Sequence, residues 1–171
     1  MTRYAAFLRG VNVGGVNLKM VEVARVFTDA GFGDVKTVLA SGNVLLDSNS
    51  GAEKVRSTAE AALRKAFGYD AWVLAYDLDT LRDISAGYPF EREVPEHHSY
   101  VTFVSDDAVL DELAGLAADA GETAARGAGV LYWQVARSAT LDSAIGKTMG
   151  KKRYKSSTTT RNLRTLDKVL R

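Results

Sequence analysis

The sequence predicts an α+β fold made of duplicated ferredoxin-like (βαββαβ) halves with antiparallel sheets. Two observations lead to this prediction. Short apolar runs typical of buried strands alternate with longer segments in which apolar residues recur every three or four positions, as in amphipathic helices. In addition, the first half of the chain shows the complete split βαβ order, and the second half repeats that order without its last strand.

The first half contains all six elements of the expected order. Strands and helices are expected at residues 4–8, 19–30, 35–39, 44–46, 52–67 and 71–76. Gly31 and Gly68 follow the two helices, and glycine adopts without strain the positive φ that commonly ends a helix. Ser41 and Asn43 lie between two strands, where we expect them to form a tight turn rather than a catalytic site.

The second half repeats the order with one strand fewer. After a helix at residues 78–85, elements are expected at residues 100–104, 105–118, 122–125, 130–135 and 161–170. Ser105 and Thr160 are the expected helix caps. The stretch 87–98 contains both prolines and therefore separates an expected first half, 1–86, from a second half, 99–171. One continuous sheet serving both halves is the alternative.

Composition excludes several classes of protein. With 46% hydrophobic and 25% charged residues, the chain has the composition of a globular protein. It has no cysteine, which excludes disulfides, thiolate catalysis and zinc–thiolate sites and favours the cytoplasm. The apolar runs are too short for a signal peptide or a membrane helix, so no membrane association is expected.

Three motifs occur in a specific order along the chain. They are FLRGVNVGG at residues 7–15, LASGNVLL at residues 39–46 and TTTRNLRT at residues 158–165. Together they resemble the signatures of a bacterial family, domain of unknown function 1697. Leu163 stands where that family usually has Trp, so a stacking role for the tryptophan does not transfer to this chain. The resemblance spans nearly the whole chain and implies an α+β architecture without an assigned function.

Positive charge is concentrated near the C-terminus. Nine Lys or Arg residues and a single acid lie between Lys147 and Arg171, a net charge of +8, and the rest of the chain carries −7. Lysine and arginine bind backbone phosphates, and a base can stack on Tyr154. This basic tail therefore predicts binding of nucleic acid or another polyanion, through Lys151, Lys152, Arg153, Lys155, Arg161 and Arg164. The alternative is that these charges pair with the acidic body or only solvate the tail.

A glycine-rich loop at residues 10–17 follows a strand and precedes a helix. In such loops, backbone N–H groups approach an anion at the helix N-terminus. The candidate anion-binding residues are Arg9, Gly10, Asn12, Gly14, Gly15 and Lys19. The glycine spacing matches neither the dinucleotide-binding motif nor the P-loop. The loop therefore predicts either an enzyme or sensor for a small phosphorylated molecule, or simply a sharp turn.

Other motifs give no chemistry. The segment 145–148 ends like a P-loop, but Leu141 stands where that motif needs glycine. His97 and His98 are adjacent, so their side chains point apart and make a poor metal pair; we place them in the stretch that joins the halves. The sequence thus assigns no catalytic residue, metal or cofactor, and leaves open whether the protein is an enzyme.

Two aromatic residues bear on the nucleic-acid hypothesis. The ferredoxin-like order also occurs in RNA-binding modules, whose sheets carry stacking aromatic residues. Tyr132 and Trp133 lie on an expected strand, but no RNA-binding motif surrounds them. Because neighbouring side chains alternate across a strand, at most one of the two is expected to be available.

Overall fold

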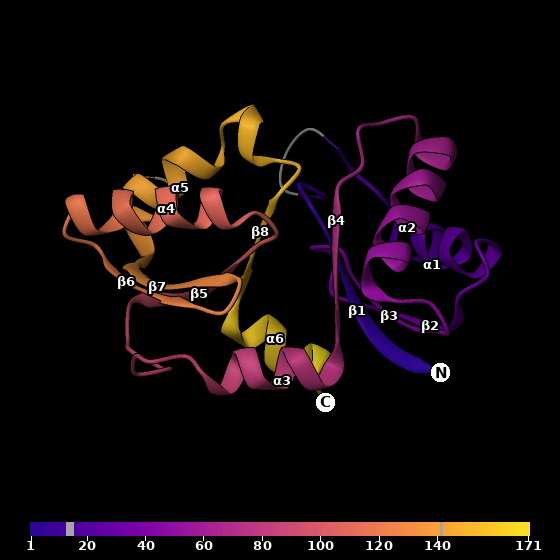
Figure 1. The fold of residues 1–171 in the computed structure, drawn as a ribbon, viewed down its shortest axis with the longest axis horizontal. Helices are drawn as coiled ribbons and strands as arrows, with labels where there is room; N and C mark the ends of the chain where they lie inside the picture. The colour runs from indigo at the N-terminus through magenta and orange to yellow at the C-terminus, as the bar shows by residue number, and fades with distance from the viewer. Residues whose placement is uncertain (13–15, 141) are drawn as a thin grey trace. The chain divides into compact units, whose positions relative to one another are not determined.

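The structure is a computed structural model that describes residues 1–12, 16–140 and 142–171. The chain forms two compact units: the first contains Met1–Leu81 with Lys168–Arg171, and the second contains Arg82–Asp167. The divisions fall inside helix α3 (Leu78–Ala86) and near the end of helix α6 (Leu163–Val169), most of which belongs to the second unit. Each unit has a four-stranded antiparallel sheet, which confirms the α+β class (Figure 1). Among the described residues, no helix is both long and apolar enough to cross a bilayer.

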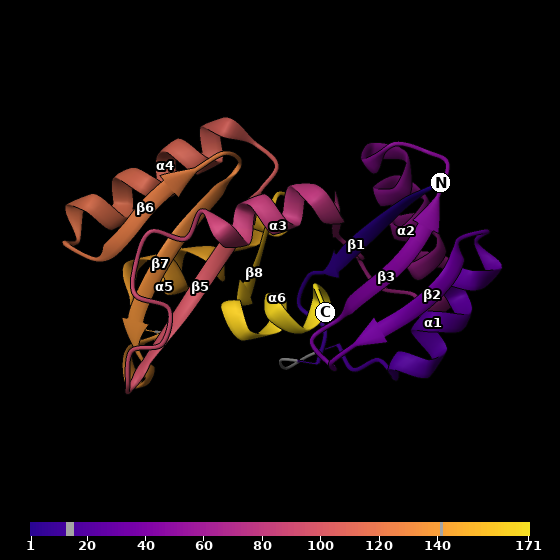
Figure 2. The ribbon, with the colours of Figure 1, turned by 90° about the horizontal axis from the view of Figure 1, so that it is seen from below.

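The first unit places two helices on one face of its sheet (Figure 2). Its elements are β1 (Thr2–Leu8), α1 (Met20–Asp29), β2 (Gly33–Val38), β3 (Asn43–Ser48), α2 (Ala52–Phe67) and β4 (Val73–Asp77). The sheet order is β2-β3-β1-β4. Val23 and Phe27 of α1 and Leu63 of α2 are fully buried against the sheet residues Leu8 and Leu46. The apolar stripes recognised in the sequence therefore form the core of this unit.

The turn between β2 and β3 has the predicted chemistry. The Asn43 side chain donates hydrogen bonds to the Val38 carbonyl (2.7 Å) and to Ser41 Oγ (2.9 Å). Gly42 has φ +87°, and a Cβ at this position would lie 2.9 Å from Leu8 Cβ. Ser41 and Asn43 thus shape the turn, and Gly42 allows it to pack closely on β1.

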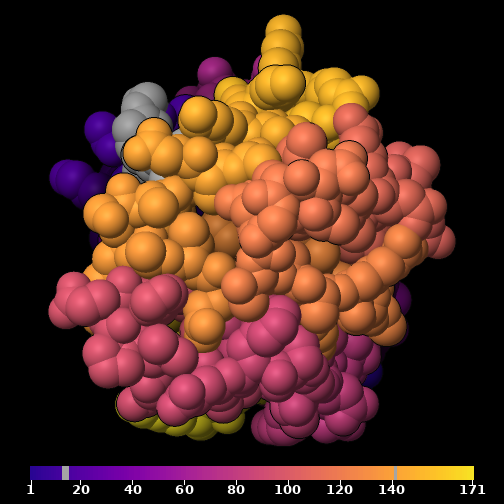
Figure 3. Space-filling view, turned by 90° about the vertical axis from the view of Figure 1, so that its left-hand side faces the viewer, coloured from indigo at the N-terminus to yellow at the C-terminus, as the bar shows by residue number. Residues whose placement is uncertain are grey.

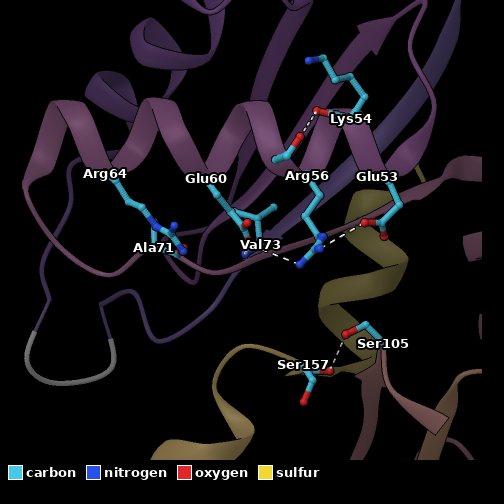
Figure 4. A network of polar contacts seen from close by, with 10 residues as sticks. Glu53, Lys54, Arg56, Glu60, Arg64, Ala71, Val73, Ser105 and Ser157 are labelled. Atoms are coloured by element: carbon cyan, nitrogen blue, oxygen red, sulfur yellow. Dashed lines mark hydrogen bonds and ion pairs between the residues drawn. The ribbon is translucent and has the colours of Figure 1, made fainter.

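Polar contacts attach α2 to β4 (Figure 4). The buried Glu60 accepts a hydrogen bond from the Val73 backbone N–H through Oε2 (2.9 Å) and lies 3.6 Å from Arg56 Nη1. Arg64 donates through Nε and Nη2 to the Ala71 carbonyl, at 3.1 and 2.8 Å. These bonds satisfy backbone groups just before and at the start of β4, where the chain enters the sheet edge.

The second unit has the same succession of elements. They are β5 (His97–Val104), α4 (Asp107–Asp119), β6 (Thr123–Gly127), β7 (Val130–Ala136), α5 (Ala144–Met149), β8 (Thr158–Asn162) and α6 (Leu163–Val169). Short 3-10 turns lie at Arg137–Ala139 and Lys152–Tyr154. The sheet order is β6-β7-β5-β8. Leu113 of α4, Ile145 of α5 and Trp133 of β7 belong to its core.

The prediction that the second half lacks its last strand is wrong. Strand β8 pairs antiparallel with β5, with Thr158 opposite Val104 and Asn162 opposite Tyr100. Its threonines are polar but β-branched, and they fit a sheet surface well. The last helix accordingly begins at Leu163 rather than at residue 161. Thr160 is not its cap; the Asn162 side chain accepts a hydrogen bond from the Arg164 N–H instead (2.8 Å).

Two other boundaries differ from the expectation. Strand β5 begins at His97, because this residue and His98 pair with Ala136 and Val135 of β7. The two histidines therefore belong to the sheet and not to an irregular connection. At the start of α4, the capping residue is Asp106 and not Ser105: Asp106 Oδ1 accepts a hydrogen bond from the Ala108 N–H (2.9 Å).

Candidate functional site

The basic C-terminal segment is an integral part of the fold rather than a tail. It contributes the second half of α5 and all of the following 3-10 turn, β8 and α6. Figure 3 shows the face on which this segment, in gold, lies beside α4. We define the lysine group as the exposed residues Lys147, Lys151, Lys152 and Lys155. Among the described residues, no carboxylate forms an ion pair with any member of this group.

Arg153 is exposed but bound to neighbouring side chains. It forms an ion pair with Glu112 of α4, donates a hydrogen bond to the Tyr154 hydroxyl and lies 4.5 Å above the centre of the Tyr154 ring. Tyr154 is only 2% exposed, and its hydroxyl donates to Glu112 at 2.5 Å. The prediction that Tyr154 stacks on a base is therefore wrong, because the core surrounds its ring.

A hollow of about 500 Å³ lies beside the lysine group, between α4 and the segment 148–154. Lys151 and Arg153 line one side of it, and the carboxylates Asp111, Glu112 and Asp119 line the other. Asp111 is paired with Arg126. Glu112 is paired with Arg153, and Asp119 adds a further negative charge on the α4 side, so a polyanion is expected to contact the lysine group from the side away from α4.

Arg161 is not part of a positive surface. It lies in β8, is 6% exposed, and its Nη1 donates to Thr159 Oγ1 (2.8 Å) and to the Thr160 carbonyl (2.9 Å). Arg164, in contrast, is exposed on α6. Of the predicted cations of this segment, Lys151, Lys152, Lys155 and Arg164 are accessible, Arg153 is exposed but paired, and Arg161 is buried. The lysine group precedes β8 and Arg164 follows it, so the two lie at opposite ends of this strand.

A row of three aromatic rings lies at the start of β5, and it was not recognised from the sequence. The rings of His98 and Tyr100 are 5.5 Å apart, and the rings of Tyr100 and Trp133 are 4.6 Å apart with an angle of 32° between their planes. His98 and Tyr100 are two residues apart and so share one face of the strand, which is the signal that could have revealed them. Both are half-buried.

Two arginines lie close enough to His98 for their charges to affect its pKa. Arg137 directly follows β7, whose Ala136 pairs with His97, and Arg164 lies two residues beyond Asn162, the partner of Tyr100. Burial lowers the pKa of His98 below its usual value, and the positive charges of Arg137 and Arg164 lower it further. The imidazole is therefore mainly neutral at neutral pH, in a positive environment.

The glycine-rich loop is described only in part. Gly14 and Gly15 lie outside the described residues. Gly10 is exposed with φ +68°, and Lys19 is exposed directly before α1. Arg9 is half-buried, burial lowers its pKa, and its backbone N–H donates to the Trp72 carbonyl (3.0 Å).

Asn12 is committed to the structure of this loop. With φ 58°, its Nδ2 donates to the carbonyls of Leu18 (3.0 Å) and Ala40 (2.7 Å), and its Oδ1 accepts from the Leu18 N–H (2.9 Å). Both amide protons and the amide oxygen are thus used within the protein. Asn12 ties the loop to the β2–β3 connection and has little capacity left for an anion.

Asn12→Ala is expected to lower the free energy of unfolding by about 1–2 kcal/mol, because three hydrogen bonds are lost and alanine is strained at positive φ. The site is half-buried, so water replaces part of the loss. Urea denaturation measures the effect. Asn12→Gly is the control: it loses the same bonds without the strain and should cost less than Asn12→Ala. Equal stability of Asn12→Ala and the wild type would contradict the structural role.

Gly146, within the P-loop-like segment, has a packing role. Its N–H donates to Oγ of Ser143, the residue that caps α5, at 2.9 Å. A Cβ at Gly146 would overlap the Thr140 carbonyl oxygen. Leu141 lies outside the described residues. The glycine is therefore explained by close backbone contact at the start of a short helix.

Neither sheet aromatic of β7 is available to a ligand. Trp133 is 2% exposed and donates through Nε1 to Thr102 Oγ1 (2.9 Å), and Tyr132 is 6% exposed and donates to the Ile84 carbonyl (2.6 Å). Both faces of the strand are covered at this point. Within the described ranges there is also no group of three or more histidine, aspartate or glutamate side chains that could hold a metal ion.

Comparison with known proteins supports the fold and gives the family. The conserved bacterial protein SP0830 from Streptococcus pneumoniae has a similar structure, with a TM-score of 0.78 and 22% identity over 98% of this chain and 96% of that chain. An unknown protein from Galdieria sulphuraria aligns over 94% and 96% of the two chains, with 10% identity and a TM-score of 0.28, too low to support an argument. No curated protein matches. Residues 1–132 match the family described as Protein of unknown function (DUF1697), and the chain belongs to this family, whose biochemical function is uncharacterised.

Proposed function

We propose that the protein binds nucleic acid or another polyanion through the lysine group and Arg164 of the second unit. The observation that carries this proposal is that these five cations are exposed and, within the part of the chain that the structure describes, have no carboxylate partner. Arg153, in contrast, pairs with Glu112 of the acidic surface, as the alternative interpretation required.

The position of these cations also supports binding. They lie on α5, in or directly beside the 3-10 turn Lys152–Tyr154, and on α6, and the buried residues Ile145, Tyr154 and Leu166 hold these segments to the core. Ordered cations lose less conformational entropy on binding than those of a disordered tail. Each phosphate that they neutralise releases condensed counterions, so the affinity should fall steeply with salt concentration.

Binding of a small phosphorylated molecule by residues 10–17 has less support. Gly10 and Lys19 are accessible, but the Asn12 side chain is used by the loop itself. A phosphate at this loop would therefore rely on few described groups. The loop remains the second place to search if the lysine group binds nothing.

We also propose that each unit is a ferredoxin-like fold. The sheet orders β2-β3-β1-β4 and β6-β7-β5-β8 support this reading, because both place the first and third strands of a unit side by side at the centre. The chain order of strands and helices agrees with it. The division into residues 1–86, 87–98 and 99–171 and the cytoplasmic location stay predictions.

Fluorescence anisotropy with labelled single-stranded DNA, duplex DNA and RNA tests the polyanion proposal. We expect the double variant Lys151→Glu/Lys152→Glu to bind at least about tenfold more weakly, with a salt dependence reduced by about two phosphate contacts. Both positions are exposed, so the fold should survive, which circular dichroism checks.

The matched control is Lys54→Glu/Lys65→Glu, which makes the same change in net charge at two exposed positions of α2. We expect this control to weaken binding much less. Equal losses in the two double variants would show that only net charge matters. Absence of binding by the wild type at low salt would overturn the proposal.

A further inference from the structure

Three aromatic rings form a row on one face of the second unit's sheet. Trp133 is buried at its inner end, Tyr100 packs on it, and His98 follows towards the start of β5. The register fixes this arrangement, because Tyr100 lies opposite Trp133 and His98 lies opposite Val135. Since Trp133 supports Tyr100 from inside, the ring row is held in place before any ligand binds.

The outer end of the ring row lies between two cations. Arg137 is anchored next to β5, because its backbone N–H donates to the Glu96 carbonyl (2.9 Å). Arg164 is anchored at the start of α6 by the bond from its N–H to Asn162. Both side chains are exposed, and among the described residues neither has a carboxylate within ion-pair distance. They follow β7 and β8, the two strands on either side of β5, and their positive charges lower the pKa of His98.

This combination matches the chemistry of an unpaired nucleotide. An aromatic surface attracts the face of a base, and guanidinium groups beside it bind the flanking phosphates. In a duplex the bases are stacked on one another and their faces are inaccessible, so only a single strand offers both groups at once. A simple polyanion would use the two arginines but gain nothing from the rings.

We propose that His98 and Tyr100, flanked by Arg137 and Arg164, form a stacking site for a base of single-stranded nucleic acid. This inference rests on the proposed function and deepens it: the lysine group supplies affinity for the backbone, and the stacking site makes the protein prefer single strands. The neutral imidazole suits this role, because an uncharged ring stacks on a base without the cost of desolvating a charge.

The experiment compares two labelled probes with the same phosphates, oligo(dT) and an oligonucleotide of equal length made of abasic tetrahydrofuran residues. We expect the wild type to bind oligo(dT) about fivefold to a hundredfold more tightly than the abasic strand. His98→Ala and Tyr100→Leu should each reduce this ratio, while binding of the abasic strand changes little. Lys151→Glu/Lys152→Glu should weaken both probes and leave the ratio unchanged.

His97→Ala is the matched control. This residue is the neighbour of His98, is exposed and points to the opposite side of β5, so its loss should not alter the ratio. Thermal unfolding checks that Tyr100→Leu still folds. If Tyr100→Leu does not fold, His98→Ala alone tests the stacking site. Equal binding of the two probes by the wild type would overturn the stacking site and leave the polyanion proposal standing. Failure to bind either probe would overturn both.

Discussion

Trp133→Ala is expected to lower the free energy of unfolding of the second unit by about 3–5 kcal/mol, the usual cost of removing a large buried aromatic side chain. Trp133 is 2% exposed, packs with α4 and α5 and lies 4.6 Å from the Tyr100 ring. Alanine would leave a cavity between sheet and helices. It would also remove the donor that binds Thr102 Oγ1, although Thr102 keeps its bond to Thr160 (2.8 Å).

The control for this prediction is Trp133→Phe, which keeps most of the apolar volume and loses only the indole N–H bond. We expect it to cost about 1–2 kcal/mol. Far-UV circular dichroism in urea follows both variants. The chain has two tryptophans, one in each unit, so the fluorescence of Trp72 reports on the first unit in the same samples. A loss below about 1 kcal/mol for Trp133→Ala would contradict a close-packed core at this position.

The parts of the fold that could be predicted from the sequence are those with a clear apolar period. Helix α2 was expected at residues 52–67 and spans Ala52–Phe67, because its apolar stripe is regular and Gly68 ends it with φ +65°. Strand β8 was missed, because a run of threonines has no apolar alternation. This segment is a strand because it pairs with β5, which lies far from it in the sequence.

The candidate site, like the fold, could be predicted from the sequence only in part. Sequence alone located the basic segment but could not separate the exposed cations without a carboxylate partner from those that are paired or buried. Arg161 became buried because β8 exists, and Arg153 became paired because α4 places Glu112 beside it. The row of His98, Tyr100 and Trp133 joins two strands, so it depends on a register that no single segment encodes.

Glu60→Ala is expected to lower the free energy of unfolding of the first unit by about 2–3 kcal/mol. Glu60 is 7% exposed, and its carboxylate accepts the backbone N–H of Val73, the first residue of β4. Alanine would leave this N–H without its partner in a buried place, and a hydrogen bond to a charged acceptor is stronger than a neutral one. The nearby ion pair with Arg56, at 3.6 Å, contributes less because Arg56 is partly exposed.

Three variants separate the two contributions. Glu60→Gln keeps an acceptor for Val73 and loses only the charge. Arg56→Ala loses the ion pairs with Glu60 and with the exposed Glu53 but leaves the bond to Val73 in place, so each variant should cost about 1 kcal/mol or less. In a Trp133→Phe background, Trp72 is the single tryptophan and directly precedes Val73, so its fluorescence in urea reports unfolding where the bond is broken. If Arg56→Ala were as harmful as Glu60→Ala, the ion pair and not the bond to Val73 would attach α2 to β4. If both were harmless, water would already solvate the start of β4, which contradicts the burial of Glu60 and Val73.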